Sequence, residues 1–159
     1  MRTVLRFRAA GIMHSMIYVG FLGLFAGTIT LEIHHLMPPS MKFLQGTTYF
    51  AYSFSLEIAS LIYLAGIGWA LFRRIFGTEF RIKTKTKMDD FLTLGLLGFM
   101  GISGLTTEAG RIIVEGFPEY EKWSFVGYFI ADILPIENGV LFHRTSWILH
   151  VISFFVFLM

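Results

Sequence analysis

The sequence contains no cysteine and few charged residues. Of its 159 residues only 15% are charged and 55% are hydrophobic, whereas about a quarter of a typical soluble domain is charged. Without cysteine the chain has no disulfide, no thiolate-bound iron–sulfur cluster and no covalently attached haem. A redox centre held by this chain therefore needs histidine ligands. The basic residues lie beside apolar runs and outside any nucleic-acid-binding motif, so we expect no nucleic-acid partner.

Long apolar runs predict an all-α integral membrane helical bundle that occupies the whole chain, 1–159. A membrane-spanning helix needs about 20 apolar residues. We expect four spans, at residues 11–33, 47–72, 91–110 and 138–159. Between the last two, segment 114–135 contains prolines and acids and predicts an interfacial stretch with a short helix near 124–134. The last run is still apolar at Met159, so we expect an incomplete span and a fragment of a longer chain.

Basic residues are concentrated on one side of the predicted spans. Those before the first span or between the second and third are Arg2, Arg6, Arg8, Arg73, Arg74, Arg81, Lys83, Lys85 and Lys87. Cytoplasmic loops of membrane proteins are enriched in lysine and arginine. We therefore expect a multi-pass protein in contact with lipid, with its N-terminus on the cytoplasmic side.

All five histidines lie at or near the ends of spans. His14 and His35 are separated by roughly 30 Å along the first span, one hydrocarbon thickness, and come within about 60° of each other around it. His34 lies nearly opposite His14. His143 and His150 are seven residues apart and share one face of the last span. Imidazole is a good haem ligand, so these two spans are candidate walls of a haem pocket; alternatively, interfacial histidines bind nothing.

The depth of these histidines limits how they can pair. His14 lies near one membrane face and His150 nearer the other, so we do not expect them to share one iron. An outer haem would use His35 or His34 with His143 or His150. His14 then needs a partner that lies beyond the end of this sequence.

Three ionisable residues lie within or beside the second and third spans. Glu57 falls in the middle of the second span, where a carboxylate is costly and usually faces the bundle interior. Three interpretations of Glu57 are open: a carboxyl group kept neutral by desolvation, a hydrogen-bond partner of a serine or threonine, or part of a proton path to a quinone. Glu108 and Arg111 are spaced to pair along one helix face, and a quinone headgroup site is the alternative.

Glycines on the first and third spans predict close helix packing. Gly20, Gly23 and Gly27 share a face of the first span opposite His14, where a packing seam is favoured over a cofactor surface. Four glycines on the third span likewise allow a neighbouring helix to approach closely, namely Gly95, Gly98, Gly101 and Gly104.

Four stretches of the sequence carry a family resemblance that covers most of the chain. They are RAAGIMHSMIYVGFLGLFAGT, FLQGTTYFAYSFSLEIASLIYLAGIGWALFRR, KMDDFLTLGLLGFMGISGL and SWILHVISFFVF. They resemble the di-haem cytochrome b module of respiratory nitrate reductase gamma subunits. Within that type, the chain is most similar to membrane-bound heterodisulfide-reductase-like proteins, including electron-transfer-flavoprotein:menaquinone oxidoreductases.

This resemblance implies a bundle of five spans, of which the chain matches the second to the fifth, with one or two b haems. His14 matches the inner ligand of the second family helix, and His150 matches the outer ligand of the last. The other outer ligand would fall at Thr28, which cannot play that part. The alternatives are a five-coordinate outer iron, or ligation further out by His34 or His35 with His143.

The resemblance also implies a function in the bacterial or archaeal cytoplasmic membrane. Such modules pass electrons between a membrane quinone, such as menaquinone, and a cytoplasmic iron–sulfur subunit or domain of heterodisulfide-reductase type, with an electron-transfer flavoprotein as a further partner. One alternative is a haem-free membrane anchor that docks a soluble redox enzyme through the basic segment between the second and third spans. A further alternative is a transporter fragment that uses Glu57. It is weaker, because no span is interrupted in the way that transporter repeats show.

Overall fold

The computed structural model describes residues 8–76, 88–134 and 137–159, and within these ranges it is helical with no strand. Its helices are α1 (Arg8–Leu36), α2 (Gly46–Phe76), α4 (Met88–Val114), α5 (Phe125–Ile133) and α6 (Gly139–Leu158), with the short 3₁₀ turns η2 (Pro39–Met41) and η3 (Glu119–Trp123). The basic segment 77–87 and the predicted anchoring residues Arg2 and Arg6 lie outside the described residues.

Four of the described helices are long and apolar enough to cross a membrane, namely Ala9–Leu36, Gly46–Phe76, Met88–Val114 and Gly139–Leu158. This finding confirms the all-α, four-span prediction. The first three helices extend a few residues beyond the predicted apolar runs at both ends. Between α4 and α6, the expected interfacial segment folds into η3 and α5.

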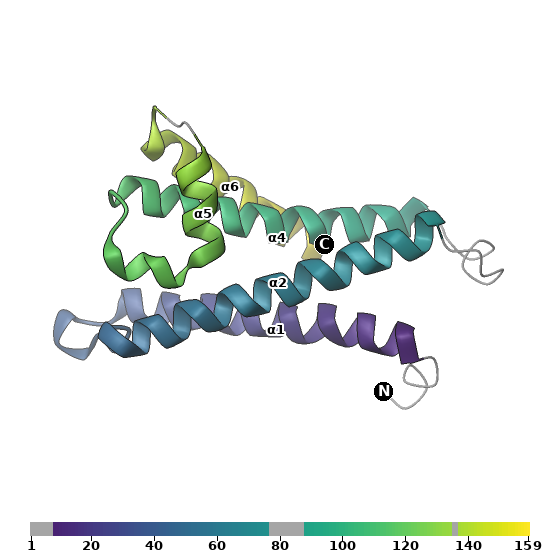
Figure 1. The fold of residues 1–159 in the computed structure, drawn as a ribbon, viewed down its shortest axis with the longest axis horizontal. Coiled ribbons are helices and arrows are strands. Elements are labelled where there is room, and N and C mark those ends of the chain that lie inside the picture. The colour runs from purple at the N-terminus through teal and green to yellow at the C-terminus, as the bar shows by residue number, and fades with distance from the viewer. Residues whose placement is uncertain (1–7, 77–87, 135–136) are drawn as a thin grey trace.

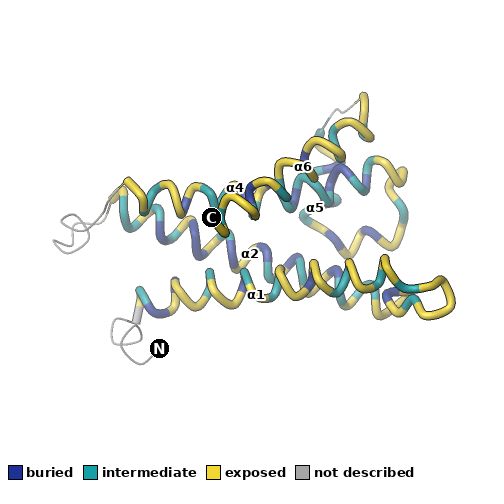
Figure 2. Tube along the Cα trace, turned by 180° about the vertical axis from the view of Figure 1, so that it is seen from behind, coloured by how far each residue is buried: buried dark blue, intermediate teal, exposed yellow. Residues whose placement is uncertain are grey.

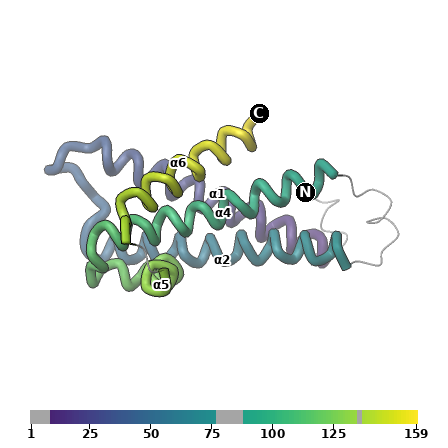
Figure 3. The backbone as a smooth tube through the Cα atoms, turned by 90° about the horizontal axis from the view of Figure 1, so that it is seen from above, coloured from purple at the N-terminus to yellow at the C-terminus, as the bar shows by residue number. Residues whose placement is uncertain are grey.

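The long helices are arranged in two packed pairs. α1 packs along α2, α4 packs along α6, and α2 joins the pairs by contacting α4 (Figure 1). The short helix α5 packs on α4 and α2 at the end of the bundle where α4 ends and α6 begins, which we call the α5 end. At the opposite end, α1 begins and α2 ends (Figure 3). There an ion pair of 2.8 Å between Arg74 and Asp90 ties the end of α2 to the start of α4.

The outward faces of the long helices are exposed and apolar. Figure 2 shows exposed residues along the outer sides of α1 and α6, and large exposed side chains on α1 include Val19, Leu22 and Ile29. A membrane-spanning helix satisfies its backbone groups internally and presents apolar side chains to lipid. The exposed faces are therefore suited to contact with the hydrocarbon core.

Small residues on α1 bring that helix close to α2. A Cβ atom added to Gly20 would lie 2.7 Å from the Cβ of Tyr63 and 2.9 Å from its Cα, so only glycine fits there. The same face continues against α2 at Gly23 and Gly27. The predicted packing seam on the first span is thus confirmed, and α2 is its partner.

Candidate functional site

Two histidines on α6 are held against α4 by their Nδ1 atoms. The Nδ1 of His150 lies 3.0 Å from the Met100 carbonyl oxygen and 3.0 Å from the Ser103 hydroxyl. The Nδ1 of His143 lies 3.0 Å from the carbonyl oxygen of Thr107. A carbonyl only accepts, so each Nδ1 carries the proton and each neutral ring keeps its lone pair on Nε2. Histidines that ligate metals characteristically have this second hydrogen bond.

Glycines on α4 make room for both histidines. A Cβ atom on Gly104 would lie 3.3 Å from Cε1 of the His150 ring. At Gly110 it would lie 2.8 Å from the Cα of His143 and 3.0 Å from its Cβ. Larger residues at these positions would displace the ring or the whole of α6, so α4 sets where the two imidazoles lie.

The histidines of α1 are in different surroundings. His34 accepts a hydrogen bond at Nδ1 from the Leu44 backbone N–H, at 3.2 Å, which leaves the proton of its neutral ring on Nε2. That tautomer is unsuited to ligation through Nε2. His14 and His35 are exposed. Among the described residues, no three histidine or acidic side chains gather in a way that would hold a metal ion by themselves.

Aromatic contacts fix the relative level of α1 and α6. They join Phe21 to Phe157, with ring centroids 6.0 Å apart, and Phe25 to Phe154, at 5.9 Å. The two helices run in opposite directions (Figure 1), and their rise per residue is equal. This register places His143 level with His35, and His150 level with Thr28. The level of His14 corresponds to a position past the end of α6.

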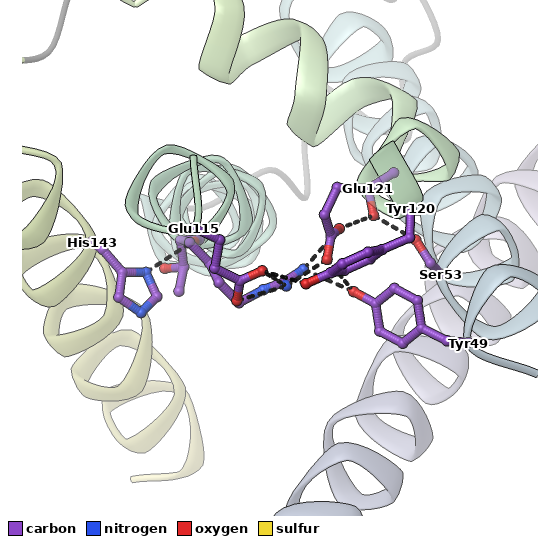
Figure 4. A network of polar contacts seen from close by, with 9 residues as sticks. Tyr49, Ser53, Glu115, Tyr120, Glu121 and His143 are labelled. Carbon is purple, nitrogen blue, oxygen red and sulfur yellow. Dashed lines mark hydrogen bonds and ion pairs between the residues drawn. The ribbon is translucent and has the colours of Figure 1, made fainter. Parts of the chain in front are cut away.

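A buried ionic network lies at the α5 end (Figure 4). Arg111 on α4 binds both carboxylate oxygens of Glu121, with its Nη1 2.6 Å from Oε1 and its Nη2 3.1 Å from Oε2. Glu121 lies in η3 and is fully buried. The hydroxyl of Tyr49 on α2 donates to Glu121 at 2.5 Å and accepts from Arg111 at 3.1 Å. The network therefore joins α2, α4 and η3.

Serine hydroxyls extend this network inward, and a glutamate extends it toward the surface. Ser124 donates to Oε2 of Glu121 at 3.1 Å and lies 2.5 Å from the Ser53 hydroxyl of α2. Arg111 lies 3.4 Å from Glu115, which accepts a hydrogen bond from Tyr120 at 3.0 Å. Ser124 is fully buried. The polar contacts thus run from the interior of the bundle to its exposed end.

Hydrogen bonds determine the charge state of Glu121. Burial alone would raise the pKa of its carboxyl group, but hydrogen bonds from Arg111 and Tyr49 outweigh burial and hold the pKa below its ordinary value of 4.5. Glu121 is therefore an anion in the folded protein.

This lowered pKa predicts a loss of stability in acid. The unfolded chain binds a proton at Glu121 at higher pH than the folded chain does, so the stabilisation is present above the ordinary pKa of 4.5 and disappears as pH falls through the folded value. The free energy of unfolding in detergent, measured from about pH 6 to about pH 3, should fall more steeply for the natural chain than for Glu121→Gln. Equal slopes would contradict this prediction.

Two further carboxyl groups meet inside the α5 end. Glu57 on α2 is 1% exposed, in agreement with the expectation that it faces the interior. Its Oε1 accepts a hydrogen bond of 3.0 Å from the Gly127 backbone N–H of α5. Glu108 of α4 lies against the same glycine. The expected pairing of Glu108 with Arg111 along α4 is replaced, since the ion pairs of Arg111 are made with Glu121 and Glu115.

The sequence did not reveal the central members of the ionic network. Tyr49, Glu121 and Ser124 come from separate elements, and each residue is common at membrane interfaces or helix starts. One signal was available, because Glu121 falls between Pro118 and a predicted short helix, in a segment already expected to lie at the interface. Nothing in the spacing indicates that Arg111 is its partner.

Comparisons with known proteins find two larger oxidoreductases. No protein-family model and no solved structure matches the chain. A curated relative named "Probable iron-sulfur-binding oxidoreductase FadF", from Bacillus subtilis, is 27% identical over 98% of this chain and 22% of its own length. The "EtfAB:quinone oxidoreductase" of Syntrophomonas wolfei is 24% identical over 98% of this chain and 23% of its own length. The chain thus spans less than a quarter of these relatives.

Proposed function

We propose that this chain is a membrane domain that holds haem b and passes electrons between a membrane quinone, such as menaquinone, and an iron–sulfur subunit or domain. The observation that carries the proposal is the anchoring of His143 and His150 to α4 carbonyls, which leaves both Nε2 atoms free to bind iron. The names of the relatives support the iron–sulfur and quinone setting. An electron-transfer flavoprotein is a further proposed partner.

The proposed position of the haem is between α1 and α6. Either His143 or His150 would ligate the iron of an outer haem from α6, and His35, level with His143, is the candidate ligand from α1. His14 would serve an inner haem whose second ligand comes from outside this chain. When bound, haem supplies one-electron redox chemistry at iron. The chain itself fixes the orientation of the two α6 rings through the contacts of their Nδ1 atoms with α4 carbonyls.

The ends of the bundle are proposed to have different roles. We propose that the α5 end faces the outer side of a bacterial or archaeal cytoplasmic membrane and that the start of α1 faces the cytoplasm, an orientation that the positive-inside rule supports. The iron–sulfur partner would then meet the end opposite α5. Glu57, Glu108 and Arg111 lie toward the α5 end and are the proposed quinone or proton-handling groups.

A reduced-minus-oxidised absorption spectrum of the purified protein tests the haem. We expect b-type bands, and we expect either His150→Ala or His143→Ala to weaken or shift them, because one of these variants removes the α6 ligand. His35→Ala tests the ligand on α1. His34→Ala is the matched control and should leave the bands unchanged, because the Nδ1 of His34 is occupied by Leu44.

Two results would contradict the proposal. A purified protein without b-type bands would favour the haem-free membrane anchor. Bands that survive replacement of His143, His150 and His35, each tested singly, would show that the haem is held elsewhere.

A further inference from the structure

A single backbone position of α5 separates two acidic side chains from different helices. The N–H of Gly127 donates to Oε1 of Glu57 at 3.0 Å. Gly127 is the third residue of α5, so its N–H has no acceptor within that helix. A Cβ atom on Gly127 would lie 2.9 Å from Cγ and 3.0 Å from Oε2 of Glu108. The missing side chain of Gly127 thus lets both carboxyl groups approach the same point.

One oxygen of this pair is buried with no partner. Glu57 is 1% exposed, and its Oε2 makes no hydrogen bond among the described residues. Ionising a carboxyl group is costly when one of its buried oxygens has no hydrogen-bond donor. In addition, two neighbouring carboxyl groups in a low dielectric cannot both be ionised. A proton on one of the two groups removes the repulsion and provides an O–H donor.

We propose that Glu57 and Glu108 together hold one proton and exchange it with the surface of the α5 end through Ser124 and Glu121. The ligand of this site is a single proton, shared as one carboxylic acid and one carboxylate. In the part of the chain that the structure describes, the charged and titratable groups that interact with the pair include Tyr52 on α2, Arg111 on α4 and Glu121 on η3. From α5 the pair meets backbone N–H groups.

The contacts of Ser124 provide the exchange route. Ser124 is the residue before α5, three residues from Gly127, against which Glu108 lies, and its hydroxyl donates to Glu121 at 3.1 Å. Glu121 is buried, but it is bonded to Arg111, whose side chain is 31% exposed. Glu121 is therefore the last buried carboxylate on the route before the protein surface. When the carboxylate of the pair takes up a proton, the other proton of the pair passes over the Ser124 hydroxyl to a carboxylate oxygen of Glu121, so the pair again holds one proton. No electron or other atom moves in this step.

The inference deepens the proposed function, on which its role in turnover rests. A quinol that is oxidised to a quinone gives up two electrons and two protons, and the pair is the acceptor of one of those protons. Proton holding by Glu57 and Glu108 needs neither haem nor quinone. A protein with the shared proton and without b-type bands would therefore contradict the proposed function and still support the proton site.

Infrared spectroscopy of the full chain in detergent or lipid nanodiscs, at neutral pH, tests proton holding. The carbonyl stretch of a protonated carboxylic acid should be present in the natural chain and lost in Glu57→Gln/Glu108→Gln. Glu119→Gln is the control, because the side chain of Glu119 is 87% exposed; it should keep the band. A natural chain without the band, or a double variant that retains it, would overturn the proposal.

The rate at which this band shifts on transfer to deuterated buffer tests the route. We expect Ser124→Ala to keep the band and to slow its shift on the order of a hundredfold, the lower end of what a positioned proton-transfer group contributes. Ser55→Ala is the control, since Ser55 is exposed and bonds only to its own helix at Ala51. Exchange as fast in Ser124→Ala as in the natural chain would refute the route through Ser124.

Discussion

Replacing Arg111 by methionine is expected to lower the free energy of unfolding by about 3 kcal/mol, because it leaves a buried carboxylate without its counter-ion. Glu121 is fully buried, and Arg111 contacts both of its oxygens. The donors Tyr49 and Ser124 remain in the variant, so the loss lies at the lower end of the range for broken buried pairs. Titration with sodium dodecyl sulfate in mixed micelles measures it.

The surface ion pair of Lys122 and Glu119 offers a matched control. Its side chains are 54% and 87% exposed, and exposed pairs contribute little to stability. Lys122→Met should therefore unfold like the natural chain. Adding Glu121→Gln to Arg111→Met removes the unpaired charge and should recover a large part of the lost stability. An Arg111→Met protein as stable as Lys122→Met would show that the buried pair does not hold η3 in place.

Gly20→Ala is expected to destabilise the protein by about 1–3 kcal/mol through overpacking between α1 and α2. The added methyl group would meet the Cβ, Cα and N atoms of Tyr63 at 2.7, 2.9 and 3.0 Å. Two of these atoms belong to the backbone, so rotation of the Tyr63 side chain gives no relief and the helices must separate. Packing is a main source of helix association in membranes, so this separation is costly. The same detergent titration measures the effect.

Two other glycines separate this clash from general effects of alanine. Among the described residues, a Cβ added to Gly68 meets no atom within 4 Å apart from its chain neighbours and the adjacent backbone of α2, so Gly68→Ala should be neutral or stabilise by up to about 1 kcal/mol through helix propensity. The three atoms nearest to a Cβ added to Gly27 all belong to the Leu56 side chain, so Leu56→Ala should rescue Gly27→Ala. No side-chain change at Tyr63 should rescue Gly20→Ala. Destabilisation by Gly68→Ala equal to that of Gly20→Ala would refute the packing explanation.

The architecture was predictable wherever a pattern repeats within one helix. Long, largely apolar runs marked all four spans, because the bilayer sets their minimum length. The cost of a charge in hydrocarbon indicated that Glu57 faces inward, and the spacing of Gly20, Gly23 and Gly27 indicated a packing face. These properties depend on near neighbours in sequence, so one chain is enough to detect them.

Contacts between elements were not predictable in the same way. The α6 histidines bond to backbone carbonyls of α4, and a carbonyl acceptor is present at every position of any sequence. The meeting of Arg111 with Glu121 depends on a reversal after α4 in which Gly116 and Phe117 have φ values of 74° and 58°. Phenylalanine is uncommon in this left-handed region. The Phe117 ring packs edge-on against Tyr128 of α5, and this contact cannot be predicted from the local sequence.

The small size of α5 has a consequence for how the protein assembles. At nine residues it is too short to cross a bilayer, so it cannot insert as an independent span. Its first turn relies on Glu57 of α2, and the buried serine before it bonds to Glu121, which Arg111 of α4 holds. Both α2 and α4 precede α5 in the chain and are therefore synthesised before it. The docked position of α5 therefore depends on the association of α2 with α4.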